Sequence, residues 1–204
     1  MTNYIKALET SKPVAFGGFS ELHIIDGKAV KVLEDGCYSD VLQECLLQKQ
    51  AADAGLAPQV HNVFRKGDDV VVVMDAIDTK NFKHSEADND DIAPTLLGEL
   101  NDDEMLKGFK LYCKMLQAGI VHADYHTGNF FFGPNGKSLA IDFGIASQLG
   151  IATKTHLTRA VQFLLPCLQR LDLGYLADDL IASYQSGSKN AIRESLEFIA
   201  AEVA

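Results

Sequence analysis

The chain has 204 residues, of which 47% are hydrophobic and 23% charged, enough to bury a sizeable core in one domain or two small lobes. Its formal net charge of -10 argues against DNA or RNA as the main partner, and no apolar stretch reaches the length of a membrane helix. We therefore expect a soluble, globular protein that binds neither nucleic acid nor a membrane. A nucleotide is still compatible, because backbone N–H groups and a few cations can hold its phosphates.

The N-terminal part predicts a β-sheet. In PVAFGGFSELHIIDGKAVKVL, residues 13–33, three short strands are expected: before Gly17-Gly18, through Leu22–Ile25 and through Ala29–Leu33. The Asp26-Gly27 pair between the last two is typical of a tight hairpin turn.

A helix and two further strands complete this part. The segment SDVLQECLLQKQAADAG has apolar residues at helical spacing, Ser39 or Asp40 as a candidate N-cap, and Gly55 as a stop. Two more strands flank the turn at residues 66–68. The prediction is a five-stranded antiparallel sheet with one helix inserted after the third strand.

The second part predicts mainly helices. After an acidic connector, NFKHSEADNDDIAPT, a helix begins near Asp102, and the turn at residues 134–136 joins two strands of a hairpin. Three amphipathic helices are expected after Gly150, at residues 157–173, 175–184 and 189–203. We expect an α+β fold with an N-lobe at about 10–77, a linker at about 78–92 and a shortened helical C-lobe at about 93–204.

The segment VHADYHTGNFFFGPNGKSLAIDFG, residues 121–144, carries the main chemical signal. Asp124 and Asn129 are five residues apart on a loop, and Asp142 follows at the end of a strand, directly before Phe143-Gly144. In phosphoryl transfer, one aspartate accepts the proton of a hydroxyl group, while an asparagine and a second aspartate hold Mg²⁺. The segment resembles the protein-kinase superfamily, since it fits H-x-D-x-x-x-x-N followed by D-F-G.

The resemblance implies roles for residues of the N-terminal part. Lys31, within Ala-Val-Lys-Val on the third strand, would grip the phosphates of ATP, and Glu44 in the following helix would hold Lys31. The phosphate-covering loop would be Gly17, Gly18, Phe19 and Ser20, without the outer glycines of the usual pattern. The adenine would bind at a hinge formed by Met74, Asp75 and Ala76.

Two departures from the usual kinase pattern point to a subgroup. Ala123 stands where regulated kinases have the arginine that pairs with a phosphorylated activation loop, and no A-P-E follows Gly144. The chain resembles the minimal kinase effectors that bacteria inject through type III secretion, which lack an activation segment. Among them are kinases activated by a ubiquitin-charged conjugating enzyme and one that phosphorylates the HSP90 chaperone. This resemblance implies a monomeric virulence effector, secreted into the host cytosol, with HSP90 as its leading candidate substrate.

His126 is compatible with other classes of phosphotransferase. The pattern H-x-D-x-H-x-x-N resembles aminoglycoside and other small-molecule phosphotransferases, although the 60 residues after Gly144 (204 minus 144) leave little chain for their substrate domain. The short Bud-type kinases that assist tRNA modification are a second rival. His126 is a candidate catalytic donor to the γ-phosphate. A nucleotide-binding pseudokinase is the non-catalytic alternative, but the chain retains the lysine and the acidic residues that pseudokinases commonly lose.

The sequence thus predicts a serine/threonine protein kinase that uses ATP and Mg²⁺. Lys31, Glu44, Asp124 and His126 are its expected catalytic residues, and Asn129 and Asp142 its expected metal ligands.

Overall fold

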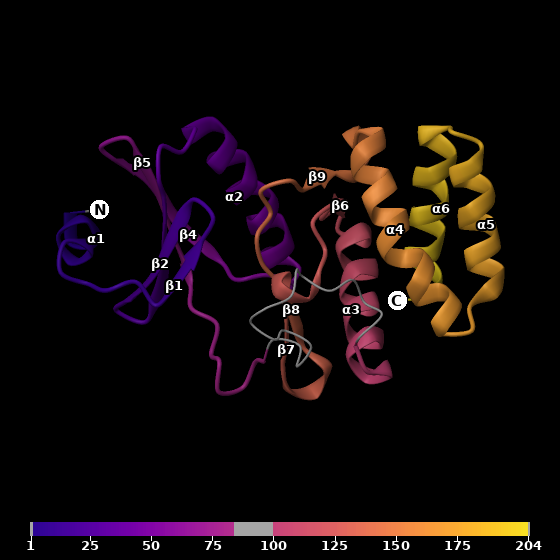
Figure 1. Cartoon of the computed structure of the whole chain (residues 1–204), viewed down its shortest axis with the longest axis horizontal. Coiled ribbons are helices and arrows are strands. Elements are labelled where there is room, and N and C mark those ends of the chain that lie inside the picture. The colour runs from indigo at the N-terminus through magenta and orange to yellow at the C-terminus, as the bar shows by residue number, and fades with distance from the viewer. Residues whose placement is uncertain (1, 84–99, 204) are drawn as a thin grey trace. The chain divides into compact units, whose positions relative to one another are not determined.

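The computed structural model describes residues 2–83 and 100–203 (Figure 1). The chain divides into an N-terminal unit, Met1–Asp78, and a C-terminal unit, Thr79–Ala204. Residues 84–92 of the expected linker lie outside the described residues.

The N-terminal unit contains the predicted five-stranded antiparallel sheet. Its strands are β1 (Ala15–Gly17), β2 (Ser20–Ile25), β3 (Lys28–Leu33), β4 (Val60–Lys66) and β5 (Asp69–Asp75), in the order β1-β2-β3-β5-β4. Asp26 and Gly27, with φ angles of 50° and 74°, form the left-handed turn between β2 and β3 that the Asp-Gly pair predicted. With the helices described below, this sheet confirms the expected α+β fold class.

The two faces of the sheet carry different helices. On one face, Val30 and Val32 of β3 belong to a core cluster against which α1 (Thr2–Leu8) packs. On the other face, Val70 and Val72 of β5 form a cluster with Val41 and Cys45 of α2 (Tyr38–Asp53). Successive side chains of a strand point to opposite faces, so the residue between Val30 and Val32 lies on the α2 side. This alternation directs Lys31 toward α2.

The start of α2 differs from the prediction. Its N-cap is Cys37, which forms no side-chain cap, whereas Ser39 and Asp40 already lie in the first helical turn. The Ser39 hydroxyl lies instead near the Asp40 carboxylate and the Cys37 thiol, at 3.3 and 3.1 Å. The prediction of the helix end is confirmed, since Gly55, with a φ of 75°, follows the last turn. The sequence analysis did not predict α1.

The C-terminal unit contains a helical bundle and short strands (Figure 1). Its elements are α3 (Asp102–Gln117), β6 (Ile120–Val121), η2 (Thr127–Asn129), β7 (Phe130–Phe132), η3 (Pro134–Gly136), β8 (Ser138–Ala140), β9 (Ser147–Gln148), η4 (Leu149–Ile151), α4 (Lys154–Arg170), α5 (Gly174–Gln185) and α6 (Lys189–Val203). The predicted hairpin is present as β7 and β8, and the three predicted helices are present as α4, α5 and α6. The helix α4 is continuous through Pro166.

Aromatic packing holds the loop after β6 in the C-terminal unit. Tyr125 stacks on Phe130 with ring centroids 4.9 Å apart, and Phe163 of α4 meets Tyr125 edge-on at 4.4 Å. The Tyr125 hydroxyl also donates a hydrogen bond to the carbonyl of Gly108 in α3. These contacts tie the loop after β6 to α3, α4 and β7.

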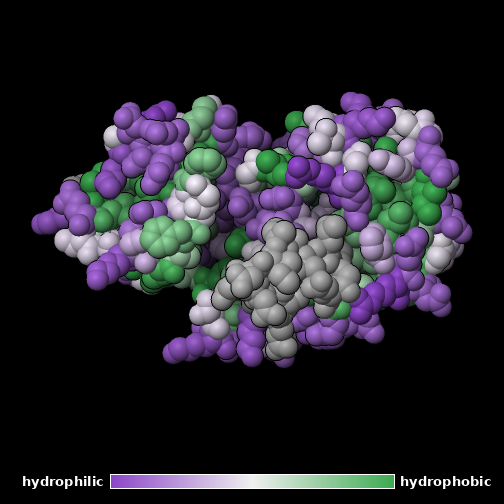
Figure 2. Space-filling view, viewed as in Figure 1, coloured by the Kyte–Doolittle hydropathy of each residue, from purple (hydrophilic) through white to green (hydrophobic). Residues whose placement is uncertain are grey.

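The surface of the described residues is mixed. Figure 2 shows hydrophilic side chains spread over both units, with smaller hydrophobic patches between them. Within residues 2–83 and 100–203, no helix is long and apolar enough to cross a membrane.

Candidate functional site

Lys31 and Glu44 meet within the N-terminal unit. The ammonium Nζ of Lys31 donates to Oε1 of Glu44 at 3.3 Å, and the two side chains are 20% and 13% exposed. The exposed pair Lys49 and Asp53 on the same helix is 51% and 60% exposed, so water screens it far more. The structure therefore brings together the lysine and glutamate that the sequence analysis paired.

The neighbouring thiol of Cys45 is not available as a nucleophile. Burial, together with the negative charge of Glu44, raises the pKa of this thiol to about 12, and Lys31 offsets the effect only in part. The protonated thiol packs instead in the core beneath α2.

The candidate phosphate loop is the tight turn between β1 and β2. Gly17 pairs with Ser20 across the turn, and Gly18 and Phe19 form its tip. A Cβ atom on Gly17 would lie 2.7 Å from the Ser20 hydroxyl oxygen, whereas one on Gly18 would meet nothing within 4 Å. Phe19 is 84% exposed, so the tip presents its backbone and an uncovered aromatic ring.

The candidate hinge residues end β5. The Asp75 carboxylate accepts a hydrogen bond from Lys28 at 2.7 Å and lies 2.7 Å from Nε2 of His61, and these two contacts hold its pKa below the usual value. The backbone N–H of Asp75 donates to the carbonyl of Gln59. Met74 receives a contact from the Gln48 amide at its sulfur, and Ala76 follows directly after the strand.

The loop that carries Asp124 begins with a strained residue. Ala123 has a φ of 47°, in the left-handed region that costs a residue with a Cβ about 1–2 kcal/mol. Before it, the fully buried His122 contacts the carbonyl of Ile141 through Nε2 at 2.9 Å and packs edge-on against Phe143. Burial lowers the pKa of His122 to about 4, so this ring is neutral at pH 7 and shapes the loop rather than carrying protons.

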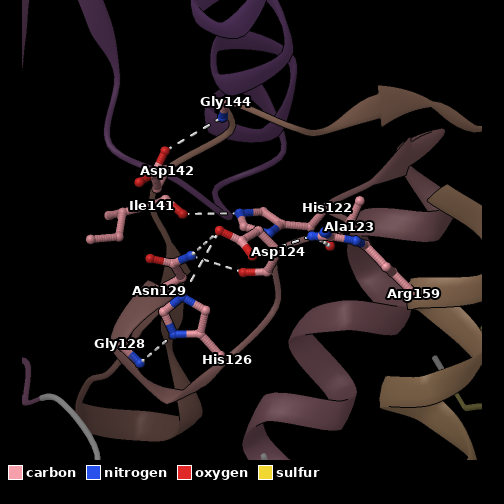
Figure 3. Close-up of polar contacts among 10 residues, drawn as sticks. All are labelled: His122, Ala123, Asp124, His126, Gly128, Asn129, Ile141, Asp142, Gly144 and Arg159. Carbon is pink, nitrogen blue, oxygen red and sulfur yellow. Dashed lines mark hydrogen bonds and ion pairs between the residues drawn. The ribbon is translucent and has the colours of Figure 1, made fainter. Parts of the chain in front are cut away.

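Asn129 joins the loop to Asp124. Its amide Nδ2 donates to the main-chain carbonyl of Asp124 at 2.8 Å and lies 3.5 Å from the carboxylate oxygen Oδ2 (Figure 3). The amide oxygen of Asn129 consequently points away from Asp124. The backbone N–H of Ile141 donates to the carbonyl of Asn129 at 2.8 Å, which places the residue before Asp142 beside the loop.

His126 has a defined orientation. The backbone N–H of Gly128 donates to Nδ1 of His126 at 3.1 Å, so Nδ1 is an acceptor and Nε2 carries the proton of the neutral ring. Nε2 lies 3.9 Å from Oδ2 of Asp124. The loop thus presents a donor next to the carboxylate.

Asp142 follows β8 in a left-handed conformation, with a φ of 60°. One of its carboxylate oxygens lies 3.5 Å from the backbone N–H of Gly144. Phe143, which is 1% exposed, is the buried anchor between the two. The sequence Asp-Phe-Gly therefore turns sharply and presents its carboxylate beside the loop that bears Asn129.

The donor set of this loop fits Mg²⁺. Asn129 and Asp142 supply an amide oxygen and carboxylate oxygens, the hard ligands that Mg²⁺ prefers. No cluster of three or more His, Cys, Asp or Glu side chains suited to a metal occurs in the part of the chain that the structure describes. A Mg²⁺ ion bound with few protein ligands and the phosphates of a nucleotide needs no such cluster.

Arg159 of α4 is a site residue that the sequence analysis missed. Its Nη1 donates to the carbonyl of Ala123 at 3.1 Å and lies 3.6 Å from Oδ1 of Asp124 (Figure 3). No local pattern could have predicted this, because Arg159 is separated from Ala123 and Asp124 by more than thirty residues and by three short strands.

Comparisons with known proteins found a family model and solved structures to which this chain is similar. Residues 68–166, slightly less than half of the 204, match the ABC1 atypical kinase-like domain. The solved structure of the kinase PK-1 from Cydia pomonella granulovirus is similar with a TM-score of 0.49 and 13% sequence identity, over 73% of this chain and 59% of that one. This chain thus spans about three fifths of the length of the viral kinase. No curated protein matches the sequence.

The ABC1 match includes the loop with Asp124 and Asn129 and the Asp142-Phe143-Gly144 turn. It supports the protein-kinase-like superfamily for these residues.

Proposed function

We propose that this protein is an ATP- and Mg²⁺-dependent serine/threonine kinase. The observation that carries the proposal is the arrangement in the C-terminal unit, where Asn129 binds the backbone of Asp124 at 2.8 Å and leaves its amide oxygen turned outward. The Lys31–Glu44 ion pair of the N-terminal unit is the second support. The Asp124–Asn129 arrangement and the Lys31–Glu44 pair both suit phosphoryl transfer. That reaction requires a lysine that binds the phosphates, metal ligands and a group that positions the acceptor.

Each residue has a distinct role in this reaction. Asp124 orients the acceptor hydroxyl and receives its proton, while the hydroxyl oxygen forms a bond to the γ-phosphorus. The bond between that phosphorus and the bridging oxygen of ATP breaks, and its electron pair leaves with ADP. Lys31 would orient the phosphates, and Asn129 and Asp142 would hold Mg²⁺, which would neutralise charge on the phosphates. His126, with its proton on Nε2, donates toward the transferred group.

The acceptor is proposed to be a host protein. The short path from Gly144 to α4 and Ala123 in place of arginine support the likeness to the secreted minimal effector kinases, and HSP90 is the leading candidate substrate on that likeness alone. An aminoglycoside-type acceptor is the second candidate, favoured by His126 two residues after Asp124.

Transfer from γ-³²P-ATP tests the proposal. Wild-type protein and Asp124→Ala are compared with Mg²⁺ in eukaryotic lysate, bacterial lysate, purified HSP90 and a panel of aminoglycosides. The expected result is a labelled protein in the eukaryotic lysate, lost by at least about 100-fold in the variant. A labelled antibiotic alone would move the protein to the small-molecule class, and silence in every arm would support the pseudokinase alternative.

A further inference from the structure

Among the described residues, the arginine Arg159 contacts the Asp124 loop twice. It approaches from α4, a different element from the loop itself. It makes a 3.1 Å hydrogen bond to the carbonyl of Ala123 and an ion pair of 3.6 Å with Oδ1 of Asp124. One guanidinium group therefore holds both the backbone before the aspartate and its carboxylate.

The backbone at Ala123 is strained, and the contact with Arg159 stabilises it. Ala123 adopts a left-handed conformation that alanine disfavours. The carbonyl of the preceding residue, His122, is bound by the N–H of Asp124 in a tight turn. A donor on the carbonyl of Ala123 stabilises the peptide group that follows the strained residue and so fixes the direction in which Asp124 leaves the turn.

The carboxylate of Asp124 is held from two sides. Oδ1 faces Arg159, whereas Oδ2 lies 3.5 Å from the Asn129 amide and 3.9 Å from His126. A carboxylate with donors on both oxygens loses freedom to rotate. Arg159 and Asp124 are 46% and 41% exposed, so their ion pair adds little to global stability, and its effect is on orientation.

The helix that carries Arg159 is itself anchored close to the loop. β9 pairs with β6, which directly precedes His122, and the N–H of Leu149 donates to the carbonyl of Gly119 at 2.7 Å. Thr153 and His156 then form a reciprocal capping box at the start of α4. The position of Arg159 is therefore set by the fold without any modified residue.

We propose that Arg159 is a positioning residue that keeps the Asp124 loop permanently in its working conformation. In many kinases the arginine that precedes the aspartate acquires its partner only after the activation loop is phosphorylated. Here Ala123 occupies that place, and an unmodified guanidinium from α4 contacts the loop directly. The expected effect of Arg159 on catalysis rests on the proposed kinase function, whereas its role in holding the Asp124 loop does not.

The test uses Arg159→Gln, Arg159→Lys and the matched control Arg193→Gln. Arg193 also donates to a main-chain carbonyl, that of Gly150, but its other hydrogen bond goes to the side chain of Asn190 on its own helix. We expect Arg159→Gln to lower kcat about 10- to 100-fold, Arg159→Lys to recover part of this loss, and Arg193→Gln to have little effect. The affinity for Mg²⁺ and a non-hydrolysable ATP analogue, measured by calorimetry, should stay within about twofold of wild type.

Hydrogen–deuterium exchange supplies a readout that needs no activity. Amides of residues 122–129 should exchange faster in Arg159→Gln than in wild type or Arg193→Gln, with unchanged exchange in α5 and α6. Equal protection in all three proteins would overturn the proposal, as would a loss of nucleotide affinity in Arg159→Gln equal to its loss of kcat. If wild-type protein transfers no phosphate to any acceptor, the kinase function fails, and the exchange result still decides whether Arg159 holds the loop.

Discussion

The side-chain amide of Asn129 donates to the main-chain carbonyl of Asp124 at 2.8 Å. This contact spans the 3-10 turn η2, and it couples a candidate metal ligand to the candidate acceptor-binding residue. Any change that rotates Asn129 therefore also moves the peptide group of Asp124.

Asp142→Asn should remove the negative charge at this position without changing the backbone conformation. Asparagine tolerates the left-handed φ of 60° at this position, so the turn is expected to persist and the melting temperature to change little. With its negative charge removed, Mg²⁺-dependent affinity for a non-hydrolysable ATP analogue should fall at least about tenfold. Calorimetry with and without Mg²⁺ measures this. An unchanged affinity would show that Asp142 is not a metal ligand.

Glu44→Gln should weaken nucleotide binding through Lys31. The variant keeps the volume of the side chain but removes the charge that lies 3.3 Å from Nζ of Lys31. We expect nucleotide affinity to fall about tenfold, as the loss of a partly buried charged hydrogen bond predicts. Asp53→Asn on the same helix is the control, since the Lys49–Asp53 pair is exposed. Equal effects of the two variants would contradict a special role for Glu44.

Gly128→Ala should disturb His126. A Cβ atom at Gly128 would lie 3.1 Å from Cε1 and 3.2 Å from Nδ1 of the imidazole, so the ring must shift by a few tenths of an ångström. Phosphate transfer is expected to fall about tenfold if His126 acts as a donor, because catalysis depends on such positions. Gly150→Ala, where the added carbon meets nothing within 4 Å, is the matched control. Full activity in Gly128→Ala would argue that His126 has no part in transfer.

The stability of the protein should fall between pH 6.5 and pH 4 in part because of His122. Its pKa is about 4 in the folded protein and 6.5 in its ordinary state, so the unfolded chain binds the proton first as the pH falls. The contribution of neutral His122 to the free energy of unfolding is complete above pH 6.5, and it decreases by about 3 kcal/mol on reaching pH 4. Urea unfolding of wild type and His122→Gln at several pH values measures it, as the difference between the free energies of unfolding of the two proteins. Parallel pH profiles would refute it.

The sequence predicted the regular elements because their signals are local. Valines at alternating positions specify β3, and a run of four valines specifies β5. The Asp26-Gly27 pair specifies the hairpin turn, and helical spacing specifies α3 to α6. The pairing of Lys31 with Glu44 was implied by the resemblance to protein kinases, and the structure adds its physical reason, because strand alternation turns Lys31 to the face that α2 covers. The predictions of the elements required only neighbours in the chain and the geometry of strands and helices.

Other features could not be predicted from local pattern. The N-cap of α2 was wrong by two or three residues, because several residues near Cys37 have capping side chains and packing decides among them. β6 and β9 have two residues each, too few for a periodic signal, and their pairing depends on where α3 ends. The contact of Arg159 with Asp124 depends in turn on that pairing.

Nine residues, Ile145–Thr153, connect Gly144 to α4, and they are occupied by β9, the 3-10 turn η4 and the bonds that fix them. So short a connection, held by these bonds, leaves little length for a segment that changes conformation on phosphorylation. The output of an enzyme built in this way would follow the number of copies present and the supply of its substrate.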